Sequence, residues 1–440
     1  MNNKTKLETR TATKLRRVAE LSGKNPKMEF RCLMPHFNKE SLIGCFNELN
    51  GKKAVGIDRQ TKEEYGRNLE ENIVNLIGRM KTMSYRPAPV REVLIPKDNG
   101  KTRPLGISNF EDKIIQLMFS KILEVVYEPI FYDFSYGFRR GRSCHQAIKA
   151  CQNYLFSNRP AMVIDVDLEN FFGSIDHRKL LALLRMKIKD KVFVRYIARM
   201  LKSGILSNGE LRKTDEGTPQ GSVVSPILAN IFAHYALDKW FVEMVATNCE
   251  GKVVIFRYAD DLVTVCGTET DAQRILQSLK ARMHRFSLKL NQEKTKLVPF
   301  DKNKLVNGEK QGTFDFLGFT FYLGNSKNGK AILPKLKTSS KRFRSKLKVV
   351  SVWCRANRHK MKMRDLWNAF SVKLAGHIRY YGVSHNSRYV LRFMAESKRI
   401  FFKWINRRGQ RKSMNWKGFG KFLEEFPPPK VKVYHNMFAI

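Results

Sequence analysis

The chain has 440 residues, 42% hydrophobic and 11% aromatic, which is enough for roughly two to four folded domains. Its 82 Lys and Arg against 40 Asp and Glu give a net charge of +42, which favours a polyanionic partner, either nucleic acid or an anionic membrane surface. No apolar run approaches the ~20 residues of a membrane span, and the seven scattered cysteines form no C-x-x-C pair, which argues against a disulfide scaffold and favours a reduced compartment.

The first 160 residues predict helices interrupted by one hairpin. Residues 1–27 form a basic N-terminal extension without the apolar core of a secretory signal. Residues 40–49, 69–80 and 110–127 have the apolar spacing of amphipathic helices. Residues 90–107 predict a strand, an Asp-Asn-Gly turn and a second strand, with cations at the rim.

Residues 161–325 mix strands and helices. A strand is expected at 161–165 and a strand pair at 314–323. A helix is expected at 225–245, with Ser225 before it and Pro226 at its first position, and another at 270–286. This stretch therefore predicts a mixed domain that follows the helical one.

The last quarter of the chain has a different character. A polar linker at 325–330 precedes expected helices that run from Thr338 or Ser339 to Cys354, and over 364–381 and 387–406. Residues 331–440 hold 27 Lys or Arg and 4 Asp or Glu, a net charge of +23. We expect a basic helical domain at 326–406 and a short basic segment at 407–440, in which three prolines at 427–429 end the compact structure.

Two adjacent aspartates carry the strongest chemical signal. Asp260 and Asp261 lie between apolar runs at 253–256 and 262–266, so they are expected at the tip of a tight hairpin. Such a pair alone is most often a solvated turn. Asp165 and Asp167 fall on one face of the predicted strand nearby, although a turn or capping role would also suit them. Together these carboxylates offer the oxygen ligands that Mg²⁺ prefers.

Several blocks, in order, resemble the bacterial group II intron reverse transcriptase/maturase family. Tyr258-Ala259-Asp260-Asp261 is similar to the family's palm signature, and Asp167 with Phe172 five positions later is similar to its first palm motif. Further similar blocks lie at residues 95–107, 135–143, 217–226, 288–296 and 316–319. The resemblance runs from about residue 40 to 325, and more loosely to 405.

The departures from the family pattern are small. Arg140 stands where the family often has Pro, and Ser222 where a second Gly is common. No Cys/His-rich segment of the kind that forms a nuclease module in many members follows residue 405, so cleavage of a DNA target is not expected of this sequence.

The resemblance implies an α+β fold in the form of a right-hand polymerase. Residues 28–160 would form the N-terminal extension and fingers, 161–325 the palm with an antiparallel sheet, and 326–406 a helical thumb. The implied activity is RNA-directed DNA synthesis from dNTPs on an RNA template and a DNA primer, with two Mg²⁺ ions or Mn²⁺ as a substitute.

The resemblance also implies roles for individual residues. Asp167, Asp260 and Asp261 would hold the metal ions, together with the backbone carbonyl of Leu168. Contacts to the incoming nucleotide would come from Lys97, Arg103, Phe172, Gln220 and Lys294, with Phe172 excluding a 2′-hydroxyl. Nucleic-acid contacts would come from Tyr258, Arg139, Arg142, Lys341, Arg342, Arg344, Lys346 and Lys348.

Other functions remain open beside polymerisation. The basic last quarter favours a maturase that binds its own structured group II intron RNA. A domesticated relative in DNA repair or phage defence would carry the same motifs, as would a polymerase restricted to DNA templates. The expected location is the bacterial cytoplasm, without a membrane partner.

Overall fold

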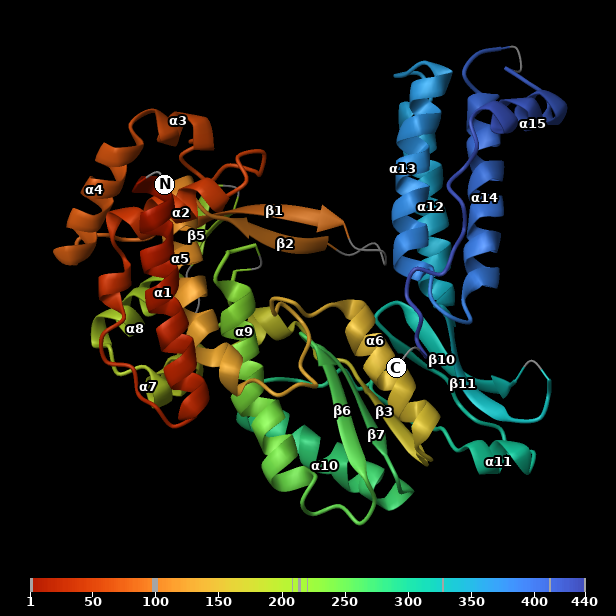
Figure 1. The fold of residues 1–440 in the computed structure, drawn as a ribbon, viewed down its shortest axis with the longest axis horizontal. Coiled ribbons are helices and arrows are strands. Elements are labelled where there is room, and N and C mark those ends of the chain that lie inside the picture. Colours follow the sequence, from red (N-terminus) through yellow and green to blue (C-terminus); the bar gives the residue numbers. More distant parts are fainter. Residues whose placement is uncertain are drawn as a thin grey trace.

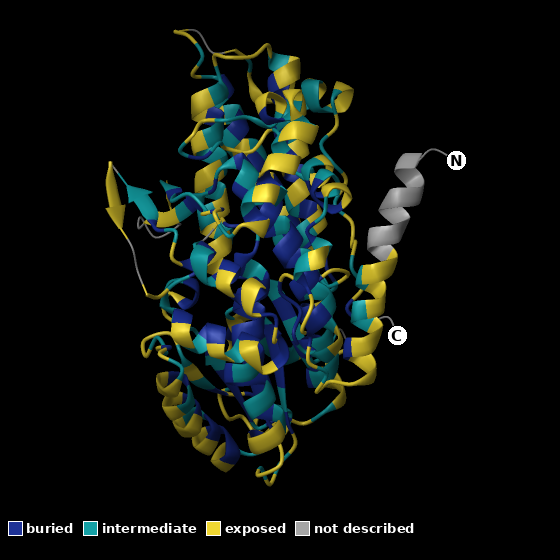
Figure 2. Ribbon diagram, turned by 90° about the vertical axis from the view of Figure 1, so that its left-hand side faces the viewer, coloured by how far each residue is buried: buried dark blue, intermediate teal, exposed yellow. Residues whose placement is uncertain are grey.

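The computed structural model describes residues 3–96, 102–207, 209–212, 215–219, 221–326, 328–410 and 413–438. They form a mixed α/β molecule, in which a helix-rich N-terminal part, a central sheet and a group of long C-terminal helices can be distinguished (Figure 1). Buried residues line the interior of the helical parts and the strands, and exposed residues cover the outer helix faces (Figure 2). The mixture of helices with mainly antiparallel strands agrees with the expected α+β class.

The N-terminal part is built around α5 (Phe110–Tyr127), which is buried on most sides. It is packed by α1 (Asn3–Lys24), α2 (Lys39–Glu48) and α3 (Lys62–Arg67), while α4 (Leu69–Lys81) packs against α2 and α3. Helix α2 begins after Asn38, whose side chain accepts from Ser41 N, and α3 begins with a capping box of Thr61 and Glu64. The helices predicted at 40–49, 69–80 and 110–127 are therefore confirmed.

The predicted hairpin is formed by β1 (Val90–Pro96) and β2 (Thr102–Ile107), which pair antiparallel. Two short strands, β4 (Ile205–Ser207) and β5 (Glu210–Arg212), extend it into a sheet of order β2-β1-β4-β5. The hairpin reaches away from the N-terminal helices toward α12 and α13 (Figure 1). Lys97, at its expected tip, lies outside the described residues.

The central sheet has the order β6-β7-β3-β8, with every neighbouring pair antiparallel. Its strands are β3 (Met162–Val166), β6 (Val253–Tyr258), β7 (Asp261–Cys266) and β8 (Lys296–Pro299). Alternation along β3 sends Ile164 and Val166 into one hydrophobic cluster and Val163 into another. Helix α10 (Glu269–Arg285) packs in the first cluster and α6 (Cys144–Ser157) in the second, so both faces of the sheet are covered.

The segment after residue 175 adds α7 (His177–Lys187), α8 (Lys191–Leu201) and α9 (Ser225–Ala233). The helix expected at 225–245 is present, but it changes character after Ala233. Its continuation contains two π-helical turns, His234–Asp238 and Phe241–Val245, and its N-cap residue is Val224 rather than Ser225. A π turn is wider than an α turn, so it changes which side chains share a helix face.

The prediction of a polar linker between two domains at 325–330 is wrong. Strands β9 (Phe314–Phe316), β10 (Phe319–Asn325) and β11 (Ile332–Thr338) form one sheet of order β11-β10-β9, and Ser326 N donates to Ala331 O at 2.7 Å between the paired strands β10 and β11. A short helix, α11 (Lys302–Val306), precedes this sheet. A domain boundary at residue 325 would cut through the β10–β11 hairpin. The sequence was misleading because Asn, Ser, Lys and Gly are common both in turns and in linkers.

The C-terminal helices are α12 (Ser340–Asn357), α13 (Met363–Tyr381), α14 (Ser387–Ile405) and α15 (Trp416–Glu425). Helices α13 and α14 match the predicted helices at 364–381 and 387–406 to within one residue at each end, whereas α12 ends at Asn357, three residues after the predicted end at Cys354. Trp367, Phe370 and Phe401 pack in their interior, with the Phe370 and Phe401 ring centroids 4.7 Å apart. None of the helices in the described part of the chain is long and apolar enough to cross a lipid bilayer.

The prediction that the prolines at 427–429 end the compact structure is also wrong. The chain beyond them returns to the end of α13, where Tyr434 N donates to Gly382 O at 2.7 Å. Met437 is 1% exposed, and the rings of His145 and His435 stack at 3.7 Å. The prolines follow the end of α15, but the compact structure continues beyond them, because apolar residues such as Met437 are buried there.

Candidate active site

The two aspartates lie at the tip of the β6–β7 hairpin, as expected. The last pair in the ladder joins Tyr258 to Asp261, which leaves Ala259 and Asp260 as the two turn residues. Ala259 has φ +58°, a left-handed conformation that residues with a Cβ adopt at a cost. We call residues 258–261 the Asp-Asp turn.

Strand register brings Asp167 to this turn. In the antiparallel pair β3–β7 the last paired residues are Val166 and Leu262. Asp167 follows Val166 and Asp261 precedes Leu262, and the negative charge of Asp167 acts on both Asp260 and Asp261. The three carboxylates predicted from the sequence therefore lie at the same end of the central sheet.

The electrostatics of the turn agree with this proximity. Burial, together with the negative charges of Asp260 and Asp167, raises the pKa of Asp261 to about 6. Burial also raises the pKa of Asp260, while the nearby charge of Arg103 opposes that shift. The site thus concentrates negative charge that a cation would stabilise.

Lys294 lies beside the first of these carboxylates. Its Nζ donates to Asp167 Oδ2 at 2.9 Å, and the lysine side chain remains 58% exposed. The backbone around it is fixed, since Asn291 N donates to Asp167 O at 2.8 Å and Glu169 N donates to Lys289 O at 2.9 Å. These two bonds flank the Leu168–Leu290 bridge, so the C=O of Leu168 is directed away from that partner strand.

A cleft of ≈1070 Å³ opens beside Asp167 and Asp261. Its walls come from β2, the 293–296 segment, β9–β10 and the start of α12. Six of its lining residues are cations: Arg103, Lys294, Lys296, Lys337, Lys341 and Arg342. Arg342 and Lys294 lower the pKa of Asp261 by their charge, which places them close to the Asp-Asp turn. The cleft is thus lined by both carboxylates and cations.

The carboxylates suit a hard divalent cation in their chemistry. Asp167, Asp260 and Asp261 offer oxygen ligands, which Mg²⁺ prefers. Burial raises the pKa values of Asp260 and Asp261, so a bound cation would favour their charged forms. Their present spacing does not form a closed ligand set, since no three His, Cys, Asp or Glu side chains among the described residues are close enough to hold a metal. The suitability of this site for a divalent cation therefore rests on its oxygen donors and their charge. In this structure Lys294 donates to one of those carboxylates, Asp167.

Phe172 lies at the end of the segment that carries Asp167. It belongs to the 3₁₀ turn Phe171–Ser174, is 7% exposed, and meets the half-exposed ring of Phe138 edge-on at 6.0 Å. Its carbonyl accepts from Thr218 N at 2.7 Å, which ties this turn to the loop at 215–219. Gln220, the next predicted contact, lies outside the described residues.

Helix α12 presents the predicted basic residues to solvent. Lys341, Arg342, Arg344, Lys346 and Lys348 are all exposed. Lys341 and Arg342 line the cleft, and the other three continue along the helix beyond its lining. These residues therefore form a cationic surface that begins at the acidic site.

Two predicted nucleic-acid contacts lie elsewhere. The side chain of Arg139 is 3% exposed, where it pairs with Glu128 and donates to the carbonyls of Tyr132 and Ser135, so its prediction as a nucleic-acid contact is wrong. Arg142 is paired with Asp133 and does not line the cleft. Tyr258 ends β6 within the turn, where burial raises its pKa to about 12.

Sequence reasoning missed a buried polar group under the turn. Arg257, directly before Tyr258, is the sole charged residue of β6, and its side chain pairs with Asp238 inside the protein. The available signal was a cation in an otherwise apolar strand, which is costly unless it is paired.

Comparisons with known proteins agree on one family. A sequence model described as "Reverse transcriptase (RNA-dependent DNA polymerase)" matches residues 95–321. Group II intron-encoded protein LtrA of Lactococcus lactis subsp. cremoris is 42% identical over 195 residues, which cover 44% of this chain and 32% of that protein. Protein YkfC of Escherichia coli is 32% identical over 277 residues, or 56% of this chain and 73% of that protein.

A eukaryotic relative shows the same pattern. The putative COX1/OXI3 intron 2 protein of Saccharomyces cerevisiae is 31% identical over 301 residues, which cover 67% of this chain and 33% of that protein. The chain thus spans about a third of the length of LtrA and of the yeast protein.

Proposed function

The chain belongs to the group II intron reverse transcriptase/maturase family, and from that premise we propose that it is an RNA-directed DNA polymerase. It would add dNTPs to the 3′-hydroxyl of a DNA primer on an RNA template. The observation that carries this proposal is the position of Asp167, Asp260 and Asp261 at one end of the central sheet, beside a cleft lined by six cations.

In this proposal the carboxylates of Asp167, Asp260 and Asp261 hold two Mg²⁺ ions, together with the Leu168 carbonyl. Bound there, the ions would supply activation of the primer hydroxyl and charge neutralisation at the leaving pyrophosphate. Binding would draw Asp167 away from Lys294, because a divalent ion is the stronger partner for a carboxylate.

The cations of the cleft would bind the triphosphate and the nucleic-acid backbone. Arg103 can meet phosphate oxygens with two parallel N–H donors, and Lys294 with a point charge. Lys97 and Gln220 stay in the proposal as nucleotide contacts. Lys341 and Arg342 would meet the duplex where it leaves the site, and Arg344, Lys346 and Lys348 would follow its phosphates.

The division into fingers, palm and thumb follows from the same proposal. The β1–β2 hairpin would close over the nucleotide, the central sheet would act as the palm, and α12–α14 as the thumb. Phe172, which packs against Phe138 and is tied to the 215–219 loop, would exclude a 2′-hydroxyl by its bulk.

A primer-extension assay tests the proposal. Purified protein with Mg²⁺ and dNTPs should extend a DNA primer on an RNA template, and Asp260→Ala should abolish extension while leaving template–primer binding in place. Extension that survives in Asp260→Ala, or its absence from the wild type, would contradict the assignment.

A second function, binding of a structured group II intron RNA, is favoured by the cationic surface of α12 beyond the cleft. It is compatible with polymerisation. Selective binding of one folded intron RNA at high salt supports it, whereas equal affinity for random RNA of the same length would contradict it.

A further inference from the structure

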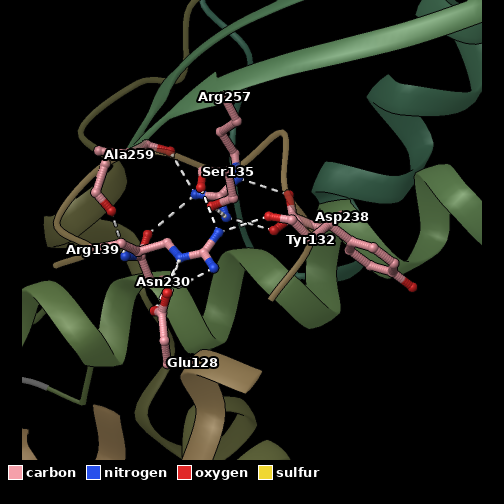
Figure 3. Close-up of polar contacts among 9 residues, drawn as sticks. Glu128, Tyr132, Ser135, Arg139, Asn230, Asp238, Arg257 and Ala259 are labelled. Carbon is pink, nitrogen blue, oxygen red and sulfur yellow. Dashed lines mark hydrogen bonds and ion pairs between the residues drawn. The ribbon is translucent and has the colours of Figure 1, made fainter. Parts of the chain in front are cut away.

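The buried ion pair under the Asp-Asp turn joins a strand to a helix. Arg257 lies in β6 and Asp238 in the first π-helical turn after α9, and their side chains are 1% and 0% exposed (Figure 3). Arg257 Nε donates to Asp238 Oδ1 at 2.7 Å, and Nη2 donates to Oδ2. This two-bond geometry fixes the plane of the guanidinium.

The remaining donors of the guanidinium reach the turn and its support. Nη1 donates to the carbonyl of Ala259 at 3.1 Å and to Asn230 Oδ1 at 3.3 Å, and Nη2 donates to Ser135 Oγ at 2.6 Å (Figure 3). The Ala259 carbonyl belongs to the peptide that connects Ala259 to Asp260. The arginine therefore holds the orientation of the peptide group that carries a metal-binding aspartate in the proposed function.

The preceding peptide of the turn, Tyr258–Ala259, is confined by the backbone of a neighbouring loop. A Cβ added to Gly137 would lie 2.3 Å from Ala259 N, so the two main chains are in direct contact. Asn230 Nδ2 donates to Gly137 O at 2.7 Å, and Tyr136 N donates to Arg257 O at 2.8 Å. Asn230 thus contacts both groups that restrain the turn.

The wide π turn helps to bring these partners together. In a regular α-helix, residues eight positions apart, such as Asn230 and Asp238, would point about 80° away from each other around the axis. A π turn rotates less per residue and reduces that separation, so both side chains reach one guanidinium.

The turn needs such a restraint because its conformation and its charges are both unfavourable. Ala259 is held at φ +58°, and Asp260 lies beside other carboxylates that repel it. Strained turns persist where the surrounding structure fixes them. A buried ion pair is seldom worth more for stability than apolar residues of the same volume, which points to a role in geometry.

We propose that Arg257, held by Asp238, Asn230 and Ser135, is a positioning residue that sets the placement of the Asp260 carboxylate for metal binding and nucleotide addition. This inference rests on the proposed polymerase function. It assigns no contact with substrate to Arg257.

The test compares three proteins: wild type, Arg257→Lys and the control Arg282→Lys. Lysine keeps the charge opposite Asp238 but lacks the fork that reaches Ala259, Asn230 and Ser135 together. Arg282 donates to the carbonyls of Tyr235 and Ala236 in the same π-helical turn and does not reach the Asp-Asp turn. The measurements are Tm, template–primer affinity, kcat and KM for single-dNTP addition, and Mn²⁺ binding to the protein by electron paramagnetic resonance.

Arg257→Lys should lower kcat and weaken Mn²⁺ binding by about 10- to 100-fold, the usual effect of losing a residue that orients metal ligands. Its template–primer affinity should stay at the wild-type value, and Arg282→Lys should keep wild-type kcat and Mn²⁺ binding. Wild-type kcat and Mn²⁺ binding in Arg257→Lys would overturn the proposal, as would an equal loss in both variants.

A second variant and the activity of the wild type separate the possible outcomes. If Arg257→Lys does not fold, Ser135→Ala replaces it, because this variant removes one hydrogen bond and leaves no buried charge unpaired. It should shift kcat and Mn²⁺ binding in the same direction by a smaller factor, and wild-type values for both would overturn the proposal. A wild-type protein without extension activity contradicts the proposed function, whereas an active wild type with an unaffected variant contradicts only the role of Arg257.

Discussion

Lys294 donates a hydrogen bond to Asp167 at 2.9 Å, so a cation from the protein sits on a carboxylate proposed to bind metal. Replacing it by alanine should have two opposite effects. Mn²⁺ binding should tighten a few-fold, about 1 kcal/mol or less for so exposed a pair, because a competing charge is removed. Single-nucleotide addition should slow by about 10- to 100-fold, because a cation beside the triphosphate is lost.

Mn²⁺ titration and single-turnover rates measure the two effects. Lys289→Ala, an exposed lysine on the same segment, is the control and should change neither. Weaker Mn²⁺ binding, or an unchanged rate, in Lys294→Ala would contradict this role.

Phe172→Ala should relax sugar selection. Its ring is buried against Phe138, and removing it opens space below the incoming sugar in the proposed site. The ratio of dNTP to NTP incorporation should fall by about 10- to 100-fold, the scale of a steric pocket contact. Phe171→Leu, a change at the neighbouring core ring that is 3% exposed, should lower Tm and leave the ratio unaltered. An identical ratio in wild type and Phe172→Ala would rule out the steric role.

Lys346→Ala should weaken template–primer binding to the same degree for every sequence. Lys346 is exposed on α12, so a contact from it would neutralise one phosphate. The slope of log K against log salt should decrease in magnitude by about 1. Binding measured at several salt concentrations gives this slope. Lys280→Ala, on the exposed face of α10, should not alter it, and an unaltered slope in Lys346→Ala would remove Lys346 from the interface.

Asp112→Asn should remove a pH dependence of stability. Burial raises the pKa of Asp112 to about 6, although Tyr85 Oη and Ala88 N donate to it. The folded state therefore holds the proton more tightly than the unfolded state. The resulting stability is present below about pH 4 and is lost as the pH rises through 6, by up to about 3 kcal/mol.

Urea unfolding between pH 4.5 and 7.5 measures this effect. The free energy of unfolding of the wild type should fall relative to that of Asp112→Asn as the pH rises. A difference between the two proteins that is constant with pH would contradict the raised pKa.

The elements predicted correctly are those set by local pattern. The helix at 110–127 and the hairpin at 90–107 have long, regular apolar spacing, which a single sequence displays directly. The meeting of Asp167 with Asp260 and Asp261 required the register of β3 against β7, and only the resemblance to a known family supplied that in advance.

What could not be predicted depends on contacts between distant segments. Arginine is a common nucleic-acid contact, yet Glu128 and two backbone carbonyls bind Arg139 inside the protein. Arg257 pairs with Asp238, which lies in a π-helical turn that no periodic pattern in the sequence predicts. The chain after residue 429 returns to the end of α13 because apolar residues such as Met437 can be buried there.

In the proposed function, Asp167, Asp260 and Asp261 form one metal-dependent site for DNA synthesis. Its most direct measurement is cDNA synthesis on an RNA template by the wild type and by Asp167→Asn, Asp260→Asn and Asp261→Asn, with template–primer affinity measured for each. We expect Mg²⁺-dependent synthesis by the wild type and a loss of about 10³-fold or more in each variant, with affinity retained, because several kcal/mol of charge stabilisation disappears. Synthesis near the wild-type rate in any of the three variants would contradict it.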